Sequence, residues 1–278
     1  MKNILLFNDF SPEAEHAASL ALLLAGKMNV NLYVWNILEY AKQPVAAEFV
    51  IANADEPILE VYQGKNDWME KLESRLHWKT GLKPPVHFIE EVNFASDNVL
   101  SVTKKYDAGL LIKGIARDER NIAYIESGVL SCSTKSGCPV MLIPKDFPYK
   151  AFEKMVYPTD LRFCRREVVY FLTQIAKNHN AAALIANISA KGLPYMEDNY
   201  ARTVFEETLL NPTTIEHIYF SNIRERDIPK AIDILVNGMN NDLLVLVNNN
   251  YHFTELMGHD TPYAIPENIN IPLLIFPS

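Results

Sequence analysis

The sequence predicts an α/β protein built from two tandem, doubly wound, five-stranded parallel sheets that are related by a pseudo-twofold axis. Three observations predict this architecture. Short apolar runs alternate with stretches of helical periodicity along the 278 residues, which is typical of parallel strands joined by right-handed crossovers. The order of these elements occurs twice along the chain. Several apolar runs contain almost no polar residue, as expected of strands that are covered on both faces.

The first half begins with an apolar run that ends before Asp9, after which Ser11 and Pro12 suit a helix N-cap and first turn. Alanines then recur at helical spacing as far as Gly26. We expect strands at residues 4–7, 31–38, 86–92, 108–113 and 139–143, with further helices at 68–76, at 97–105 and before the fifth strand. Gly114 would end the fourth strand.

The second half repeats this order. Its first strand ends at Asp160, and Val168, Phe171, Leu172 and Ile175 then lie on one helical face. We expect strands at residues 155–159, 182–188, 215–220, 243–247 and 272–276, and further helices at 195–210 and 228–238.

The two halves also match at particular positions. Asp107 and Asp242 each open a fourth strand, and the two last strands share a Pro-x4-Pro frame, at residues 139–144 and 272–277. The shared order of these matches indicates an internal repeat. We therefore predict two domains, at residues 1–147 and 148–278, with a linker near residues 145–150.

The charge of the chain argues against two classes of partner. Its formal net charge is −8, from 34 acidic and 26 basic residues, and no long basic run is present. Nucleic acids and anionic membrane surfaces both attract Lys and Arg, so we expect neither as a partner.

The three cysteines, Cys132, Cys138 and Cys164, form no C-x-x-C pair, so we expect buried reduced thiols and no zinc or other metal site. The apolar run at the N-terminus is too short for a signal peptide, and no stretch reaches the roughly 20 apolar residues of a membrane helix. We therefore expect a cytoplasmic protein.

Five segments together resemble the universal stress protein family, in its tandem two-domain form. They are ILLFNDFSPEAEHAASLALLLA at 4–25, DAGLLIKG at 107–114 and SGCPVMLIP at 136–144, with the weaker VYPTDLRFCRREVV at 156–169 and NDLLVLV at 241–247. The resemblance implies an adenine-nucleotide alpha-hydrolase-like fold in which two domains of one chain take the place of a homodimer. It also implies that the two fifth strands pair with each other across the pseudo-twofold axis.

The candidate ligand site lies at the carboxyl ends of the strands, where the strand order reverses. In the family this point lies between strands one and four, which would bring Asp9 next to the loop that starts at Gly114, and Asp160 next to residues 248–258. ATP-binding members carry a loop G-x2-G-x9-G-[ST], in which glycines let backbone N–H groups approach phosphates. Here Gly114 fits the first position, and Ser127-Gly128 reverses the final pair.

This sequence also departs from the family loop, because Arg117 stands where the second glycine would be. In the second half only Gly258 is a glycine, and Pro266 would break a helix there, so we expect no phosphate-binding helix N-terminus after the ninth strand.

Each candidate has a structural alternative. Asp9 and Asp160 would serve equally well as helix caps, Gly114 as the end of a strand, and Ser127 as an N-cap before Gly128. We expect His252 to be a solvated loop histidine.

We expect a non-enzymatic stress-response or regulatory protein that binds a protein partner or a small ligand, because no nucleophile, base and orienting group occur at informative spacing. No catalytic residue and no cofactor are expected. The alternative is an ATP- or AMP-binding protein with slow hydrolysis that uses Asp9, Gly114, Ser127 and Gly128. A third reading is a carrier of apolar ligands. The sequence leaves open whether the chain forms a homodimer.

Overall fold

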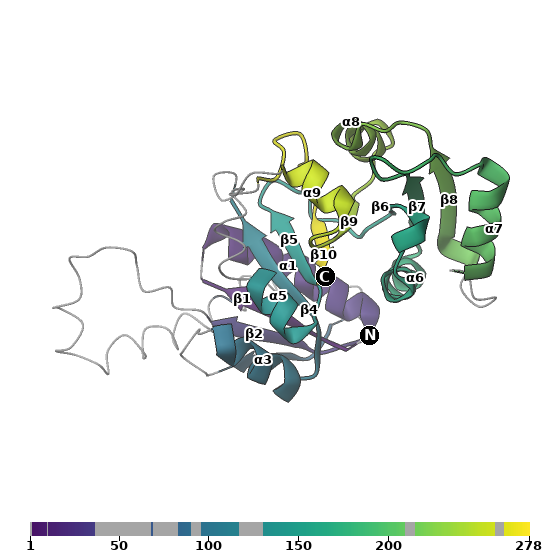
Figure 1. Cartoon of the computed structure of the whole chain (residues 1–278). Coiled ribbons are helices and arrows are strands. Elements are labelled where there is room, and N and C mark those ends of the chain that lie inside the picture. The colour runs from purple at the N-terminus through teal and green to yellow at the C-terminus, as the bar shows by residue number, and fades with distance from the viewer. Residues whose placement is uncertain are drawn as a thin grey trace, which may run out of the picture.

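In the computed structural model, the described residues are 2–9, 11–36, 68, 83–89, 96–116, 130–208, 215–258 and 264–278. Within them the chain forms a mostly parallel ten-stranded sheet with helices on both faces (Figure 1). None of the helices in these ranges is long and apolar enough to cross a bilayer.

The first half of the sheet has the strand order β3-β2-β1-β4-β5, and the second half continues it as β10-β9-β6-β7-β8. All strands within each half pair in parallel. The strands of the first half are β1 (Asn3–Asn8), β2 (Leu32–Asn36), β3 (Val86–Ile89), β4 (Ala108–Ile115) and β5 (Val140–Pro144). Those of the second half are β6 (Lys154–Thr159), β7 (Ala182–Ile188), β8 (Ile218–Ile223), β9 (Leu243–Val247) and β10 (Leu273–Phe276).

The two halves join through β5 and β10, which pair antiparallel with Met141 opposite Leu274. The strand order reads the same outward from this pair in both directions, which is the arrangement that a twofold axis between β5 and β10 produces. The predicted repeat and the predicted pairing of the fifth strands are therefore confirmed. The β5–β10 pair joins the two predicted sheets into one continuous sheet. Each half thereby loses an exposed edge strand, which would otherwise favour aggregation.

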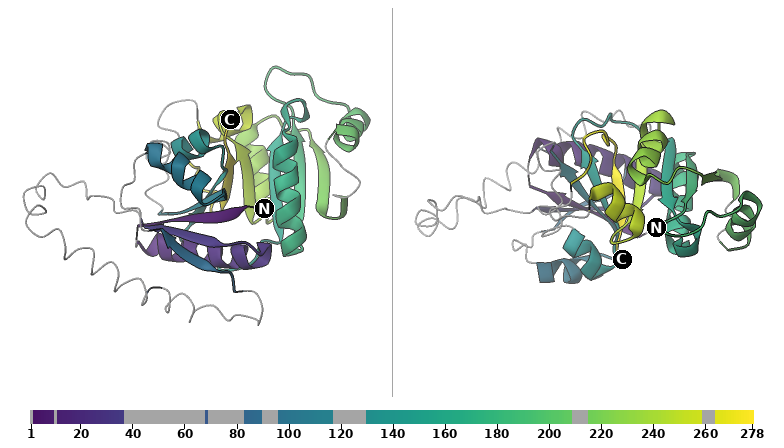
Figure 2. Two further views of the ribbon diagram at one scale, coloured as in Figure 1. Left: turned by 90° about the horizontal axis from the view of Figure 1, so that it is seen from below. Right: turned by 45° about the horizontal axis from the view of Figure 1, so that its top comes forward.

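Helices cover both faces of the sheet (Figure 2). One face carries α1 (Pro12–Met28), α6 (Arg166–His179) and α7 (Asp198–Thr208), and the other carries α3 (Ser96–Lys105), α5 (Ser131–Ser136), α8 (Ile228–Asp233) and α9 (Tyr251–Met257). Alternate strand residues supply the two cores: Ile4 and Leu6 point to the α1 face, whereas Leu5 and Phe7 point to the α3 face. Each core contains side chains from both halves.

The long helices α1 and α6 end in the same way. Each is followed by an asparagine in the left-handed conformation, Asn29 with φ 53° and Asn180 with φ 54°, whose backbone N–H caps the last turn. Asparagine adopts this conformation at low cost, so it ends the helix and turns the chain into the next strand. The internal repeat therefore extends to the helix caps.

The expected boundaries differ from the structure at several places. The expected strand at 215–220 begins later, at Ile218, because residues 215–217 form a 3-10 turn, η4 (Ile215–His217). The expected helix at 228–238 ends in a π-helical turn, η5 (Ile234–Gly238). Most of the helix expected at 68–76 lies outside the described residues.

Candidate functional site

The strand order reverses between β1 and β4 in the first half and between β6 and β9 in the second. Both points lie where the resemblance implied. The carboxyl ends of these strands carry Asp9 and Gly114 in the first half, and Asp160 and Asn248 in the second. We therefore built the candidate site from these four positions.

Asp9 is half-buried and orients the start of α1. Its Oδ1 accepts hydrogen bonds from the backbone N of Ser11, at 3.0 Å, and from the Ser11 hydroxyl, at 2.5 Å. Ser11 is the N-cap, because its Oγ accepts from the backbone N of Ala14 at 3.1 Å. Asp9 thus holds the capping residue and does not cap the helix itself. Its second carboxylate oxygen has no hydrogen-bond partner within the described parts of the chain.

Gly114 lies inside β4 and does not end it, which corrects the expected strand boundary. A Cβ atom at this position would lie 2.1 Å from the carbonyl oxygen of Glu13 in the first turn of α1. No real Cβ approaches a backbone oxygen so closely, and the backbone cannot move aside as a flexible side chain can. Glycine is therefore required here so that α1 can pack against β4, independently of any ligand.

The rest of the first candidate loop falls outside the described residues. This applies to Ser127 and Gly128, and to Arg117 at the departure from the family pattern. Their roles, and the nucleotide-binding roles of Asp9, Gly114 and Asp160, stay predictions.

Asp160 has very different surroundings from Asp9, although both end a first strand. Its side chain is 1% exposed, and it caps the 3-10 turn η3 (Leu161–Phe163). Oδ1 accepts from the backbone N of Arg162, at 3.0 Å, and lies 3.0 Å from the Arg162 guanidinium Nε. Oδ2 accepts from the backbone N of Ala190 at 2.9 Å. Both oxygens are therefore already engaged by the chain.

Arg162 also fastens the loop that follows β7. Its guanidinium donates to the Ser189 hydroxyl at 3.2 Å and to the Pro194 carbonyl at 2.8 Å. We call Asp160, Arg162, Ser189, Ala190 and Pro194 the second-half latch. No sequence pattern indicated this latch, because its members come from two segments that only the fold brings together.

Buried amides form a network beside the latch. Asn187, at the end of β7, accepts from the backbone N of Leu161 at 2.9 Å and donates to Asn222 of β8 at 2.7 Å. In the first half Asn8 donates to Asn36 at 2.9 Å. Amide pairs therefore join the carboxyl ends of β1 and β2 in the first half and of β7 and β8 in the second, and they were not singled out from the sequence.

His252 was expected in a solvated loop, and this was wrong. It lies in α9, a helix of seven residues that starts after the Asn250 N-cap. Its ring is 2% exposed, and Nε2 lies 2.9 Å from the Ile188 carbonyl. Burial lowers the pKa of His252, while the Ile188 carbonyl and the Asp160 carboxylate oppose that shift. A side chain from α9 is therefore buried against the carboxyl end of β7 in the second half.

In the ranges that the structure describes, no three His, Cys, Asp or Glu side chains are grouped so that they could hold a metal ion. The three cysteines are free thiols, and burial raises the pKa of Cys132 to about 11. A reactive thiolate is thereby disfavoured at this position.

A groove of about 400 Å³ lies at the opposite, amino-terminal end of the first-half strands. Lys2, Lys104 and Asp107 line it, together with the C-terminal residues of α3 and α5, whose carbonyl ends favour cations. Lys2 is paired with Asp107 at 2.9 Å. These groups favour neither a cation nor an anion, so the groove specifies no class of ligand.

Comparison with solved structures shows that the fold is shared with tandem universal stress protein structures. The chain superposes on a universal stress protein from Archaeoglobus fulgidus with a TM-score of 0.63 and 13% identity, over 99% of this chain and 96% of that one. A protein of unknown function from Pseudomonas aeruginosa gives a TM-score of 0.57 at 12% identity, over 100% of this chain and 92% of that one. No family model and no curated protein matches the sequence.

Proposed function

Proceeding from the tandem universal stress protein fold, we propose that this chain is a non-enzymatic stress-response or regulatory protein that acts by binding a protein partner or a small ligand. The fold is shared over the full length with the Archaeoglobus fulgidus universal stress protein. One observation carries the proposal: in the second half, the carboxylate that would meet a ligand is buried and occupied by Arg162 and Ala190.

The burial of the ionisable side chains at the strand ends argues against a catalytic site in this half. A catalytic group needs access to a substrate and a partner that moves its proton. Asp160 is 1% exposed and His252 is 2% exposed, and each is hydrogen-bonded to the chain itself. The second half then serves to complete the sheet and the cores, and binding falls to the first half or to the outer surface.

The second candidate is an ATP- or AMP-binding protein that uses the first-half cleft. It is favoured by Asp9, whose second carboxylate oxygen accepts no hydrogen bond from the described residues and so can accept from a donor such as the adenine amino group. Gly114 does not discriminate between the two candidates, because packing against Glu13 already explains it.

Native mass spectrometry and a thermal shift with ATP and magnesium separate the candidates. We expect freshly purified protein without bound nucleotide, and no shift at millimolar ATP. A ligand present at 100 times its dissociation constant would stabilise the fold by about 2.7 kcal/mol, which such an experiment detects.

Two variants make this test specific. Asp9→Asn keeps an oxygen that can accept from Ser11 but removes the charge. Asp227→Asn is the matched control, since Asp227 caps α8 in the second half by accepting from the backbone N of Lys230. ATP stabilisation or turnover that is lost in Asp9→Asn and kept in Asp227→Asn would replace the first candidate by the second.

A carrier of apolar ligands would hold its ligand in the clefts at the strand ends, and it is not proposed because no observation there favours it. We place the protein in the cytoplasm as part of the same proposal, since three free thiols suit a reducing compartment.

A further inference from the structure

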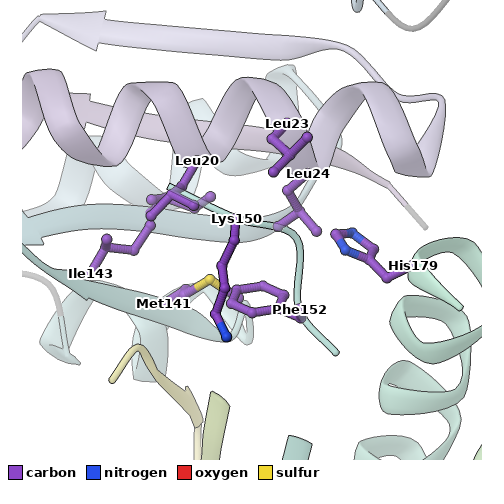
Figure 3. A pocket seen from close by; sticks show the side chains of 9 residues that line it. Leu20, Leu23, Leu24, Met141, Ile143, Lys150, Phe152 and His179 are labelled. Atoms are coloured by element: carbon purple, nitrogen blue, oxygen red, sulfur yellow. The ribbon is translucent and has the colours of Figure 1, made fainter. Parts of the chain in front are cut away.

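The two halves meet on one face of the sheet at a small apolar cavity (Figure 3). Leucines of α1 and side chains of β4 and β5 line it from the first half, and Lys150, Phe152 and His179 line it from the other side. We call this cavity, together with the contact between α1 and α6, the seam. Its apolar lining and volume of about 10 Å³ leave no room for an organic ligand.

His179, the last residue of α6, reaches into the seam toward α1. It is 7% exposed, and its ring stacks on Phe152 with centroids 5.7 Å apart and planes 27° apart. Neither ring nitrogen has a hydrogen-bond partner in the described parts of the chain. A buried imidazole without partners is tolerated far better as the neutral ring than as the cation.

The charged groups that face this ring add to that preference. Lys27 comes from α1, and Lys150 comes from the segment before β6, where its amine pairs with Asp242 at 3.3 Å. The lining from β4 and β5 is apolar. Burial, and then the charge of Lys27, lower the pKa of His179 to about 4, and no carboxylate in the described residues opposes them.

His16, on α1, differs from His179 because neighbouring groups oppose the lowering of its pKa. Burial lowers its pKa, but the Phe147 carbonyl and the Asp146 carboxylate oppose that shift. The C-terminal carbonyls of α6 would favour a cation at His179, whereas burial of its ring, which has no hydrogen-bond partner in the described residues, opposes one. Protonation of His179 therefore places an uncompensated charge between the two halves.

We propose that His179 makes the seam acid-sensitive, so that protonation of its ring loosens the packing of α1 against α6 and exposes apolar surface from both halves. The device is built into the contact between the halves and does not depend on either ligand cleft. A stress-response protein with this device would change its exposed surface when the surroundings turn acidic.

The sign and the pH window follow from proton linkage. Above the ordinary histidine pKa of 6.5 the ring is neutral in both states, and the seam keeps its full stability. As the pH falls from 6.5 towards 4, the opened seam binds a proton that the closed seam does not, so opening becomes more favourable. Between pH 7.5 and pH 5.5 the opening constant should rise about tenfold.

Hydrogen exchange measured by mass spectrometry on the intact chain tests this, with rates corrected for the intrinsic effect of pH. We expect the opening constants of amides in α1 and α6 to rise about tenfold between pH 7.5 and pH 5.5. In His179→Phe, whose ring can still stack on Phe152, the rise should be less than twofold. His179→Leu serves as a second variant in case the larger ring does not fit.

His87→Gln is the control, because His87 is exposed on β3 and should leave the response unchanged. Amides of β8, at the outer edge of the sheet, give the background response. A tenfold rise that persists in both His179 variants would overturn the proposal. So would a wild-type seam that responds no more than β8.

Discussion

Gly114 shows how one missing side-chain atom fixes the relation between a strand and a helix. From the sequence, the glycine could equally have opened a phosphate loop or ended a strand. Both interpretations use the conformational freedom of a backbone without a Cβ atom. The structure gives it a packing role, since the Glu13 carbonyl oxygen lies 2.1 Å from where a Cβ would be. A residue that looks like part of a ligand loop can therefore be required by the core alone.

Replacement of Gly114 by alanine should be costly for this reason. We expect Gly114→Ala to lower the free energy of unfolding by about 3 kcal/mol, because α1 must move away from β4. Gly238→Ala is the matched control, since its Cβ would meet only a side-chain methyl of Ile234, at 3.6 Å, and should change stability by less than about 1 kcal/mol. Urea denaturation measures both, and equal effects would contradict the packing role.

The second-half latch acts between elements. It ties the η3 turn after β6 to the loop between β7 and α7, through contacts of Arg162 with Asp160, Ser189 and Pro194. The first half has an aspartate at the matching strand end, but within the described residues Asp9 hydrogen-bonds only to the N-cap of its own helix. The two repeats thus share their strands and differ in the described hydrogen bonds of this aspartate.

Removal of the guanidinium should release that loop. We expect Arg162→Ala to lower the free energy of unfolding by about 3 kcal/mol, because the buried carboxylate of Asp160 loses its counter-charge. Arg224→Ala removes an exposed pair with Asp198 and should cost less than about 1 kcal/mol. Limited proteolysis between Ser189 and Pro194 should increase only in Arg162→Ala, and cleavage that is unchanged there would contradict the latch.

On the scale of the whole molecule, the two halves are structural repeats, but they share one sheet and both hydrophobic cores. The sheet is continuous through β5 and β10, and each of its two cores includes side chains from both halves. A half on its own would expose the seam and a strand edge, which favours aggregation. The same shared packing is why one buried charge at His179 should affect both halves.

Unfolding should therefore be a single cooperative transition. The three tryptophans, Trp35, Trp68 and Trp78, all lie in the first half, so their fluorescence follows that half alone. Far-ultraviolet circular dichroism follows both. We expect the two probes to give the same urea midpoint, whereas separate midpoints would indicate that the halves unfold independently.

The sequence by itself determined the alternation of strands and helices, the internal repeat and the cap at Ser11. These depend on local periodicity and on short motifs, which a single segment contains in full. The pairing of β5 with β10 was expected only because the resemblance to a known family implied it. It failed at α9, where Pro266 and the asparagines before Tyr251 suggested an irregular loop, because the helix is only seven residues long and ends before Pro266.

Only the tertiary structure decided what surrounds each candidate side chain. Asp9 and Asp160 read alike in sequence, yet Asp160 meets Ala190, and His252 meets Ile188 from a distant segment. His179 reads as the end of an amphipathic helix, and its burial depends on α1 from the other half. The physical reason is that burial and hydrogen bonding depend on neighbours in space, whereas the pattern of a segment reports only its own period.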